Sequence, residues 1–155
     1  MDVRLDKVLL EEKDILYRLL QFALYDGSLY NTNKIGEDGL FPYKWFDNYF
    51  TDDDRDAFFI REDDKIVGFV MINQFMKKCD NGHSVAEFLV LPEYRRNHIG
   101  KKVAYLVFEM FPGNWEVEPI EESNEACRFW ENVVVNYTNN KFSFSDGIYV
   151  FKNHS

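Results

Sequence analysis

The stretch Val90-Leu91-Pro92-Glu93-Tyr94-Arg95-Arg96-Asn97-His98-Ile99-Gly100-Lys101-Lys102 connects a β-rich segment to a helical one. A loop rich in backbone donors runs here into a helix N-terminus, where unpaired N–H groups and the helix dipole can hold a diphosphate. Four basic residues lie in this stretch, although the chain carries a net charge of −9: Arg95, Arg96, Lys101 and Lys102. Basic residues at this end of a helix oppose the dipole, so they favour a bound anion. The alternative is an ordinary strand-to-helix turn whose charges only face solvent.

The segments on either side of this stretch predict a strand, a helix and a second strand. A strand is predicted for residues 84–91, and a helix begins at Ile99 and stops at Pro112-Gly113. Trp115 and Val117 then alternate with polar residues as in a strand. Such a unit places its two strands parallel with a right-handed connection. Since Gly100 is the only glycine of the loop, the P-loop and the dinucleotide fingerprint are both absent.

The rest of the chain adds further strands and helices, and no linker or repeat divides it. We expect one mixed α/β domain over residues 1–155 with about seven strands and four helices. Their predicted ranges are a strand at 3–9, a helix ending at 25–27, a short helix at 44–50, a hairpin of 57–61 with 65–73, a helix around 126–134 with Ser123 or Asn124 as its cap, and a hairpin of 142–145 with 148–151 around Asp146-Gly147.

Composition and charge exclude several classes of protein. With 46% hydrophobic and 29% charged residues the chain is in the globular range, and its acidic balance argues against nucleic-acid or anionic membrane partners. Cys79 and Cys127 lie far apart without metal-site spacing, so neither a disulfide framework nor a metal site is expected. The N-terminus lacks the pattern of a signal peptide, and the longest apolar run, 66–72, is far shorter than the ~20 residues of a membrane span. We expect a soluble cytoplasmic protein.

The run from Val90 to Lys101 resembles the acetyl-CoA signature of the GNAT superfamily of N-acetyltransferases, Q/R-x-x-G-x-G/A after a V-x-P-x-Y lead-in. The order of helices and strands is similar to that family from end to end, so the chain is identified as a single-domain, bacterial-type member. The resemblance implies a mostly antiparallel sheet with a central, splayed parallel pair. It also implies acetyl-CoA as cofactor, with His98 standing at the first glycine position of the signature. The residues implied to hold the pantetheine arm and the pyrophosphate are Phe88, Leu89, Val90, Arg95, Arg96, Asn97, His98, Ile99, Gly100 and Lys101.

A second segment, Ser123 to Trp130, is similar to the family's N-x-x-A-x-x-F-Y segment. The resemblance implies that Ser123, Asn124 and Trp130 lie on the cofactor side. Trp130 replaces a tyrosine that serves in the family as the acid for the departing thiolate, a role that tryptophan cannot fill. Tyr137 is a candidate substitute, with a packing role as the alternative. A thiol with a pKa near ~8.5 can also leave without an acid.

A general base is needed more, because an amine with a pKa of ~10.4 is neutral in only about one molecule in a few thousand at pH 7. Glu87, in the strand that leads to the loop, is the best-placed carboxylate and resembles the family's frequent strand glutamate. The alternative is an outward-facing residue without a role. Glu116 and Glu118 on the next strand are lesser candidates.

The substrate side is expected between the first two helices, where aromatic residues and carboxylates suit an ammonium group. The candidate substrate-binding residues are Tyr25, Tyr30, Trp45 and Phe46. We therefore expect acetyl transfer from acetyl-CoA to a primary amine of a small molecule or peptide, by direct attack in a ternary complex. The alternatives are a non-catalytic acyl-CoA-binding domain and a protein-interaction domain with the same fold. Dimers are common in the family, so a homodimer is kept beside a monomer.

Overall fold

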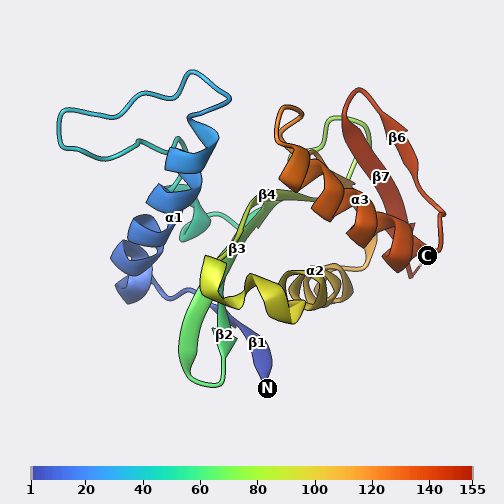
Figure 1. Ribbon diagram of the computed structural model, residues 1–155, viewed down its shortest axis with the longest axis horizontal. Coiled ribbons are helices and arrows are strands. Elements are labelled where there is room, and N and C mark those ends of the chain that lie inside the picture. The colour runs from blue at the N-terminus through green and yellow to red at the C-terminus, as the bar shows by residue number, and fades with distance from the viewer. Residues whose placement is uncertain (1, 155) are drawn as a thin grey trace.

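A computed structural model describes residues 2–154, without the side chain of Arg96. Along these residues, three α-helices lie between groups of one to three strands (Figure 1). Their bounds are β1 Val3–Lys7, α1 Lys13–Gly27, β2 Arg55–Glu62, β3 Lys65–Asn73, β4 His83–Val90, α2 Ile99–Met110, β5 Gly113–Val117, α3 Asn124–Thr138, β6 Ser143–Ser145 and β7 Ile148–Asn153; short 3-10 turns lie at Leu10–Glu12, Asp47–Tyr49 and Pro92–Asn97.

Within residues 2–154, seven strands form one sheet in the order β1-β2-β3-β4-β5-β7-β6. Neighbouring strands are antiparallel except for β4 and β5, which are parallel. This parallel pairing joins His83 to Trp115 and Ser84 to Glu116, and it does not extend further along β4. From Val85 onward β4 is therefore paired with β3 alone, and the two central strands separate toward the end of β4.

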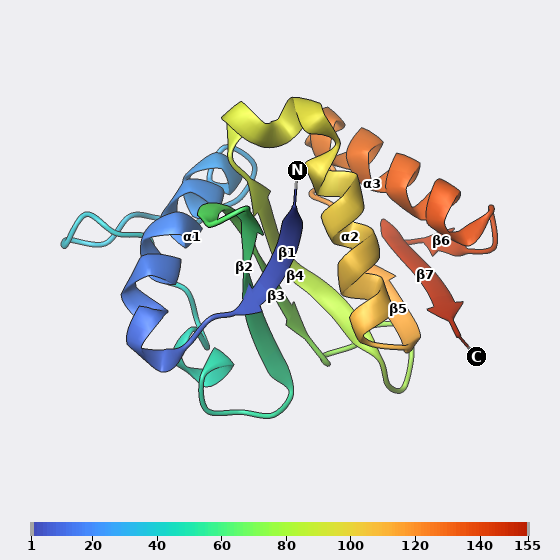
Figure 2. The ribbon, with the colours of Figure 1, turned by 90° about the horizontal axis from the view of Figure 1, so that it is seen from below.

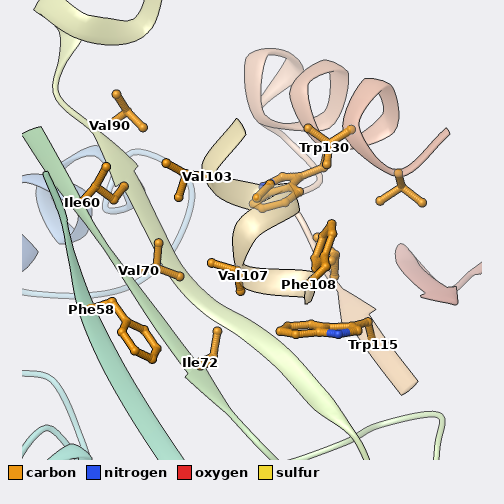
Figure 3. Packing of buried hydrophobic residues seen from close by; sticks show 14 of the residues in the cluster. Phe58, Ile60, Val70, Ile72, Val90, Val103, Val107, Phe108, Trp115 and Trp130 are labelled. Carbon is orange, nitrogen blue, oxygen red and sulfur yellow. The ribbon is translucent and has the colours of Figure 1, made fainter. Parts of the chain in front are cut away.

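The sheet separates two layers of helices, with α1 on one face and α2 and α3 on the other (Figure 2). Burial of apolar side chains on both faces supplies the main stabilisation. On the α1 face Leu16 and Leu20 are fully buried against Phe59 and Phe69 of the sheet. On the other face side chains of α2 and α3 pack on β2, β3, β4 and β5; Val103 and Phe108 of α2 lie in this core together with Trp115 of β5 (Figure 3).

The structure confirms the predicted fold class, including the parallel strand pair around α2 and its splay. Ser123 is the predicted cap of α3, since its hydroxyl accepts a hydrogen bond from the Ala126 N–H at 3.2 Å. The C-terminal hairpin turns at Asp146-Gly147, where both residues have positive φ. This backbone conformation matches the turn that favours such a dipeptide.

One predicted helix is wrong. The sequence predicts a fourth helix over residues 44–50, but these residues contain only the 3-10 turn Asp47–Tyr49. Trp45 has a φ of 69°, a left-handed conformation that no α-helix of L-residues contains. The described part of the chain thus has three α-helices rather than four. None of the helices within residues 2–154 has the length and apolar character needed to cross a bilayer.

Candidate functional site

Glu87 lies on β4 beyond the last residue that pairs with β5, beside the open edge of the strand. Its side chain is partly buried, and the Tyr43 hydroxyl donates a hydrogen bond to Oε2 at 3.2 Å. Burial raises the pKa of Glu87 to about 7, and the hydrogen bond from Tyr43 opposes that rise. A carboxyl group that titrates near neutral pH can take up a proton and release it again.

Tyr43 cannot serve as an acid in this position. Burial raises its pKa well above the ordinary value, and the neighbouring charge of Glu87 raises it further. The phenol therefore stays protonated and acts as a hydrogen-bond donor. Burial also raises the pKa of Tyr49, whose ring centroid lies 6.4 Å from that of Tyr43. Both tyrosines therefore stay neutral beside the Glu87 carboxylate, and their hydroxyl groups can donate hydrogen bonds.

The loop after β4 forms the 3-10 turn Pro92–Asn97 and then enters α2 through His98. His98 has φ 56° and ψ 22°, the left-handed conformation that glycine adopts most easily. The Lys102 N–H donates to the His98 carbonyl at 3.2 Å, so the N–H groups of the preceding residues lie ahead of this first helical bond. Among the described side chains none caps this end of α2, and no acidic residue lies in its first turn. The end of α2 therefore suits an anion.

The open edge of β4 is engaged at one point by the loop itself. Arg95 donates from Nε to the Val90 carbonyl oxygen at 2.7 Å. The predicted cofactor residues Phe88, Leu89 and Val90 lie in the part of β4 beyond its pairing with β5; the Leu89 carbonyl faces β3, and Arg95 is bonded at Val90. A ligand that bonds to the Val90 carbonyl would share this acceptor with the Arg95 guanidinium or displace it.

The predicted cofactor residues of α3 differ in their exposure. Ser123 and Asn124 lie at its beginning, whereas Trp130 is 7% exposed and packs edge-on against Phe88. Gly100 allows α3 to approach α2, because a Cβ there would lie 2.9 Å from Cε1 of Phe129. Trp130 thus packs against β4 as an apolar core residue and does not present a polar group between β4 and β5. Figure 3 shows its ring directed toward α2 and the sheet.

Tyr137, the candidate acid, lies in a different cluster from Glu87. Its hydroxyl donates to the Glu109 carboxylate and accepts from Nδ2 of Asn153 at 3.0 Å. Its ring packs against Phe108 and Phe151, near the C-terminal ends of α2 and α3. The structure therefore does not bring Tyr137 together with Glu87 and Tyr43.

The two lesser base candidates are also engaged elsewhere. Glu116 is 3% exposed and accepts hydrogen bonds from the N–H groups of Lys77, Lys78 and Cys79 at 2.8, 2.9 and 2.8 Å. Burial alone would raise its pKa, but these donors outweigh that effect and hold the pKa below its usual range. Glu118 is half exposed and forms an ion pair with Lys77 at 2.6 Å. Neither carboxylate is therefore as well suited to accept a proton as Glu87.

The predicted substrate residues are spread over the α1 side of the molecule. Tyr25 and Tyr30 are exposed near the C-terminal end of α1, and Trp45 is exposed before the 3-10 turn. Lys44 and Arg55 lie over the Trp45 ring, at 5.0 and 5.5 Å from its centroid. Phe46 is only 6% exposed and packs against Tyr17 and Phe50, so its ring belongs to the core.

Two residues of this site are not predicted from sequence. Tyr43 falls only within a general aromatic region, and Gln21 carries no signal, although both sides of its amide bond to Phe41. Glu87 is 44 residues from Tyr43 along the chain. The Tyr-Lys-Trp-Phe run around residue 43 contains no motif that indicates such a contact.

Comparison with protein families gives one match: residues 16–133 match the acetyltransferase (GNAT) family. Comparison with curated protein sequences gives no match. The chain thus has the fold, the splayed strand pair and the sequence of an acetyltransferase enzyme. It belongs to the GNAT acetyltransferase family, whose members generally use acetyl-CoA as acyl donor.

Several solved structures have the same fold. An acetyltransferase from Thermus thermophilus has a TM-score of 0.67 at 12% identity, over 98% of this chain and 97% of that chain. A ribosomal-protein-alanine N-acetyltransferase from Brucella melitensis biovar Abortus 2308 has a TM-score of 0.60 at 17% identity, over 85% and 90%. An aminoglycoside acetyltransferase from an uncultured soil metagenomic sample, in complex with sisomicin, has a TM-score of 0.60 at 14% identity, over 84% and 86%. At these identities the likeness shows the fold.

Proposed function

We propose that this chain transfers an acetyl group from acetyl-CoA to a primary amine of a small molecule or peptide, with Glu87 as the general base. The observation that carries the proposal is the position of the Glu87 carboxyl group beside the open edge of β4, where burial raises its pKa to about 7. The solved relatives named for an aminoglycoside and for a ribosomal-protein alanine support amines as the class of acceptor. Acetyl-CoA, when bound, supplies the acetyl group as a thioester.

The residues present fit that cofactor. The separation of β4 from β5 leaves strand edge for the extended arm, and the uncapped N-terminus of α2 offers N–H groups to the pyrophosphate. Lys101 and Lys102 add positive charge at this end of α2. Backbone N–H groups on the open edge of β4 can polarise a carbonyl that lies within reach.

Direct attack forms a bond from the amine nitrogen to the acetyl carbon while the carbon–sulfur bond breaks. Glu87 accepts one proton from the nitrogen, and the sulfur leaves as a thiolate. Tyr137 takes no part in this step, because its hydroxyl is hydrogen-bonded to Glu109 and Asn153. The proposed substrate surface comprises Tyr25, Tyr30 and Trp45, which are exposed, and excludes Phe46, which is buried.

The base assignment is tested by pH–rate profiles of the wild type and Glu87→Gln, with thiol release as the readout. We expect wild-type kcat/KM to fall below about pH 7, since only the ionised carboxylate accepts a proton. Glu87→Gln should lose at least about tenfold at pH 8 and lose this acidic limb. Glu118→Gln is the matched control, because that carboxylate is paired with Lys77 on the surface. An unchanged profile in Glu87→Gln would exclude Glu87 as the base.

The cofactor assignment is tested separately by calorimetric titration with acetyl-CoA. Lys101→Glu should weaken binding at least about tenfold, whereas Lys65→Glu in the β2–β3 hairpin should not. Tight binding without thiol release over a broad panel of amines would favour a non-catalytic acyl-CoA-binding domain. No binding at millimolar acetyl-CoA would remove the cofactor site from the proposal.

A further inference from the structure

The contact between Tyr43 and Glu87 joins two distant parts of the chain at the proposed site. Tyr43 belongs to the long segment between α1 and β2, and Glu87 belongs to β4. Among the side chains that the structure describes, which exclude that of Arg96, Tyr43 is the one that donates a hydrogen bond to the Glu87 carboxylate. The bond reaches Oε2, and none of the described side chains donates to Oε1. One oxygen is held and the other is available for a proton.

The position of Tyr43 depends on hydrogen bonds that α1 side chains make to the backbone of Phe41, two residues earlier. The Gln21 side chain accepts from the Phe41 N–H at 2.6 Å and donates to the Phe41 carbonyl oxygen at 2.9 Å. The Tyr17 hydroxyl donates to the same carbonyl oxygen at 3.0 Å. Pro42, between Phe41 and Tyr43, has its φ fixed by the ring. Two residues of α1 therefore determine where the Tyr43 side chain begins.

The hydrogen bond from Tyr43 is the main interaction that favours the ionised form of the Glu87 carboxyl group. Among the described residues, the titratable side chains that face the carboxylate are Tyr43 from the loop and Tyr49 from the 3-10 turn. Its partner across the ladder on β3 is the apolar Met71. Arg55, from β2, acts on Tyr49, while burial is the main influence on Glu87 and the Tyr43 bond opposes it. Removing the Tyr43 hydroxyl thus leaves burial unopposed.

We propose that Tyr43 is a positioning residue that holds Glu87 ionised and oriented for proton transfer, and that the Gln21 amide sets Tyr43 in place for this role. This inference rests on the proposed role of Glu87 as base. It assigns no chemical step to the phenol, which keeps its proton throughout. Its effect is on the fraction of Glu87 that is ionised near neutral pH and on which oxygen faces the amine.

The test compares Tyr43→Phe with the wild type by the pH dependence of kcat/KM. Loss of the donor should move the acidic limb upward by about one pH unit, because a hydrogen bond to the charged form of an acid lowers its pKa. At pH 9 and above, the rate should recover to within about threefold of wild type. A purely structural role would instead lower the rate at every pH and leave the limb in place, and that result would overturn the inference.

A second readout does not use turnover. The Glu87 carboxyl carbon is followed by NMR titration in the unliganded protein, with Glu87→Gln to assign its signal. We expect its pKa to lie about one unit higher in Tyr43→Phe than in the wild type. Gln21→Leu, which breaks both bonds to Phe41 but keeps the phenol, should shift the pKa in the same direction by less. Tyr149→Phe, in β7, is the control and should leave the Glu87 pKa unchanged. An unmoved Glu87 pKa in both Tyr43→Phe and Gln21→Leu would contradict the inference.

The two proposals can fail separately. If Glu87→Gln keeps a normal acidic limb, the base is another group and the proposed function is revised, whatever Tyr43 does. If Glu87→Gln loses the limb while Tyr43→Phe leaves both limb and carboxyl pKa in place, Glu87 remains the base and Tyr43 has no positioning role.

Discussion

A Cβ attached to Gly68 would lie 2.1 Å from the carbonyl oxygen of Leu89, so β3 and β4 approach each other at this point more closely than any side chain permits. Gly68 pairs with Val90, the last residue of β4 before the loop, and the Leu91 N–H donates to the Val67 carbonyl oxygen at 2.8 Å. The close approach fixes the exit of β4, and with it the position from which the loop to α2 begins.

Gly68→Ala should therefore be costly. The backbone of β3 or β4 has to move, and we expect a loss of about 3 kcal/mol in the free energy of unfolding, the upper range for overpacking. Urea unfolding followed by tryptophan fluorescence measures it. Gly27→Ala at the end of α1 is the matched control, since its Cβ would meet nothing closer than Asn31 Nδ2 at 3.5 Å. Equal stability of the two variants would show that the strands can separate freely at Gly68.

Glu87 should make the folded protein less stable at alkaline pH. Its folded pKa of about 7 exceeds the ordinary value of 4.5, so the folded state binds more protons than the unfolded state between these values. Stability is lost as pH rises through that interval. Glu87→Gln should thus be more stable than the wild type at pH 8, by up to about 3 kcal/mol, with no such gain at pH 4. Urea unfolding at the two pH values measures this difference, and a gain that is the same at both would refute the raised pKa.

Glu116 should show the opposite sign. Its pKa is held low by three backbone N–H donors, so its contribution is present above the unfolded pKa and is lost as pH falls through the folded value. Glu116→Gln turns an amide N–H toward those donors and should cost about 2 kcal/mol at pH 7, because buried donors lose their acceptor. The cost should shrink in acid. Thermal unfolding at pH 7 and pH 4 checks it, and a cost that grows in acid would contradict the assignment.

His98 should cost stability through its backbone conformation. The left-handed backbone conformation of His98 destabilises the folded state by about 1–2 kcal/mol relative to a glycine there. Glycine offsets part of this gain, because it has more conformational entropy in the unfolded chain. His98→Gly should therefore stabilise the protein by about 0.5 kcal/mol and tighten acetyl-CoA binding a few fold. His98→Ala removes the imidazole but keeps the Cβ, so it should bring no gain in stability. Urea unfolding and calorimetry of the two variants separate backbone from side chain; equal gains in stability for both would assign the effect to the imidazole.

The sequence was sufficient for features that depend on local pattern. The strand, helix and strand around Ile99, the Ser123 cap and the Asp146-Gly147 turn all follow from spacing within a few residues, and the structure contains each of them. Glu87 stands out in the sequence because it lies in the strand that leads to the loop. Its raised pKa depends on what covers the strand, which the sequence alone does not show.

Features that depend on long-range contact were not predictable in this way. The Gln21 amide bonds to Phe41 across 20 residues, and Tyr43 reaches Glu87 across 44. No periodicity connects these positions, because residues 28–46 contain no helix or strand, and the whole of β2 and β3 separates Tyr43 from Glu87 along the chain. The short helix predicted at residues 44–50 failed for a related reason. The chain turns at Trp45, and this turn brings the neighbouring Phe46 and Tyr49 into the core on the α1 face of the sheet.

The two-residue pairing of β4 with β5 has a consequence for the cooperativity of unfolding. Between β1–β4 and the β5-β7-β6 group the backbone ladder is short, so the two groups of strands are coupled mainly by the shared side-chain core on the α2 and α3 face. The C-terminal strands are therefore the part of the sheet able to open as a separate unit, with amide exchange faster than in β2 and β3. Any molecule that bonds to both sides of the splay would join the two units and protect them together.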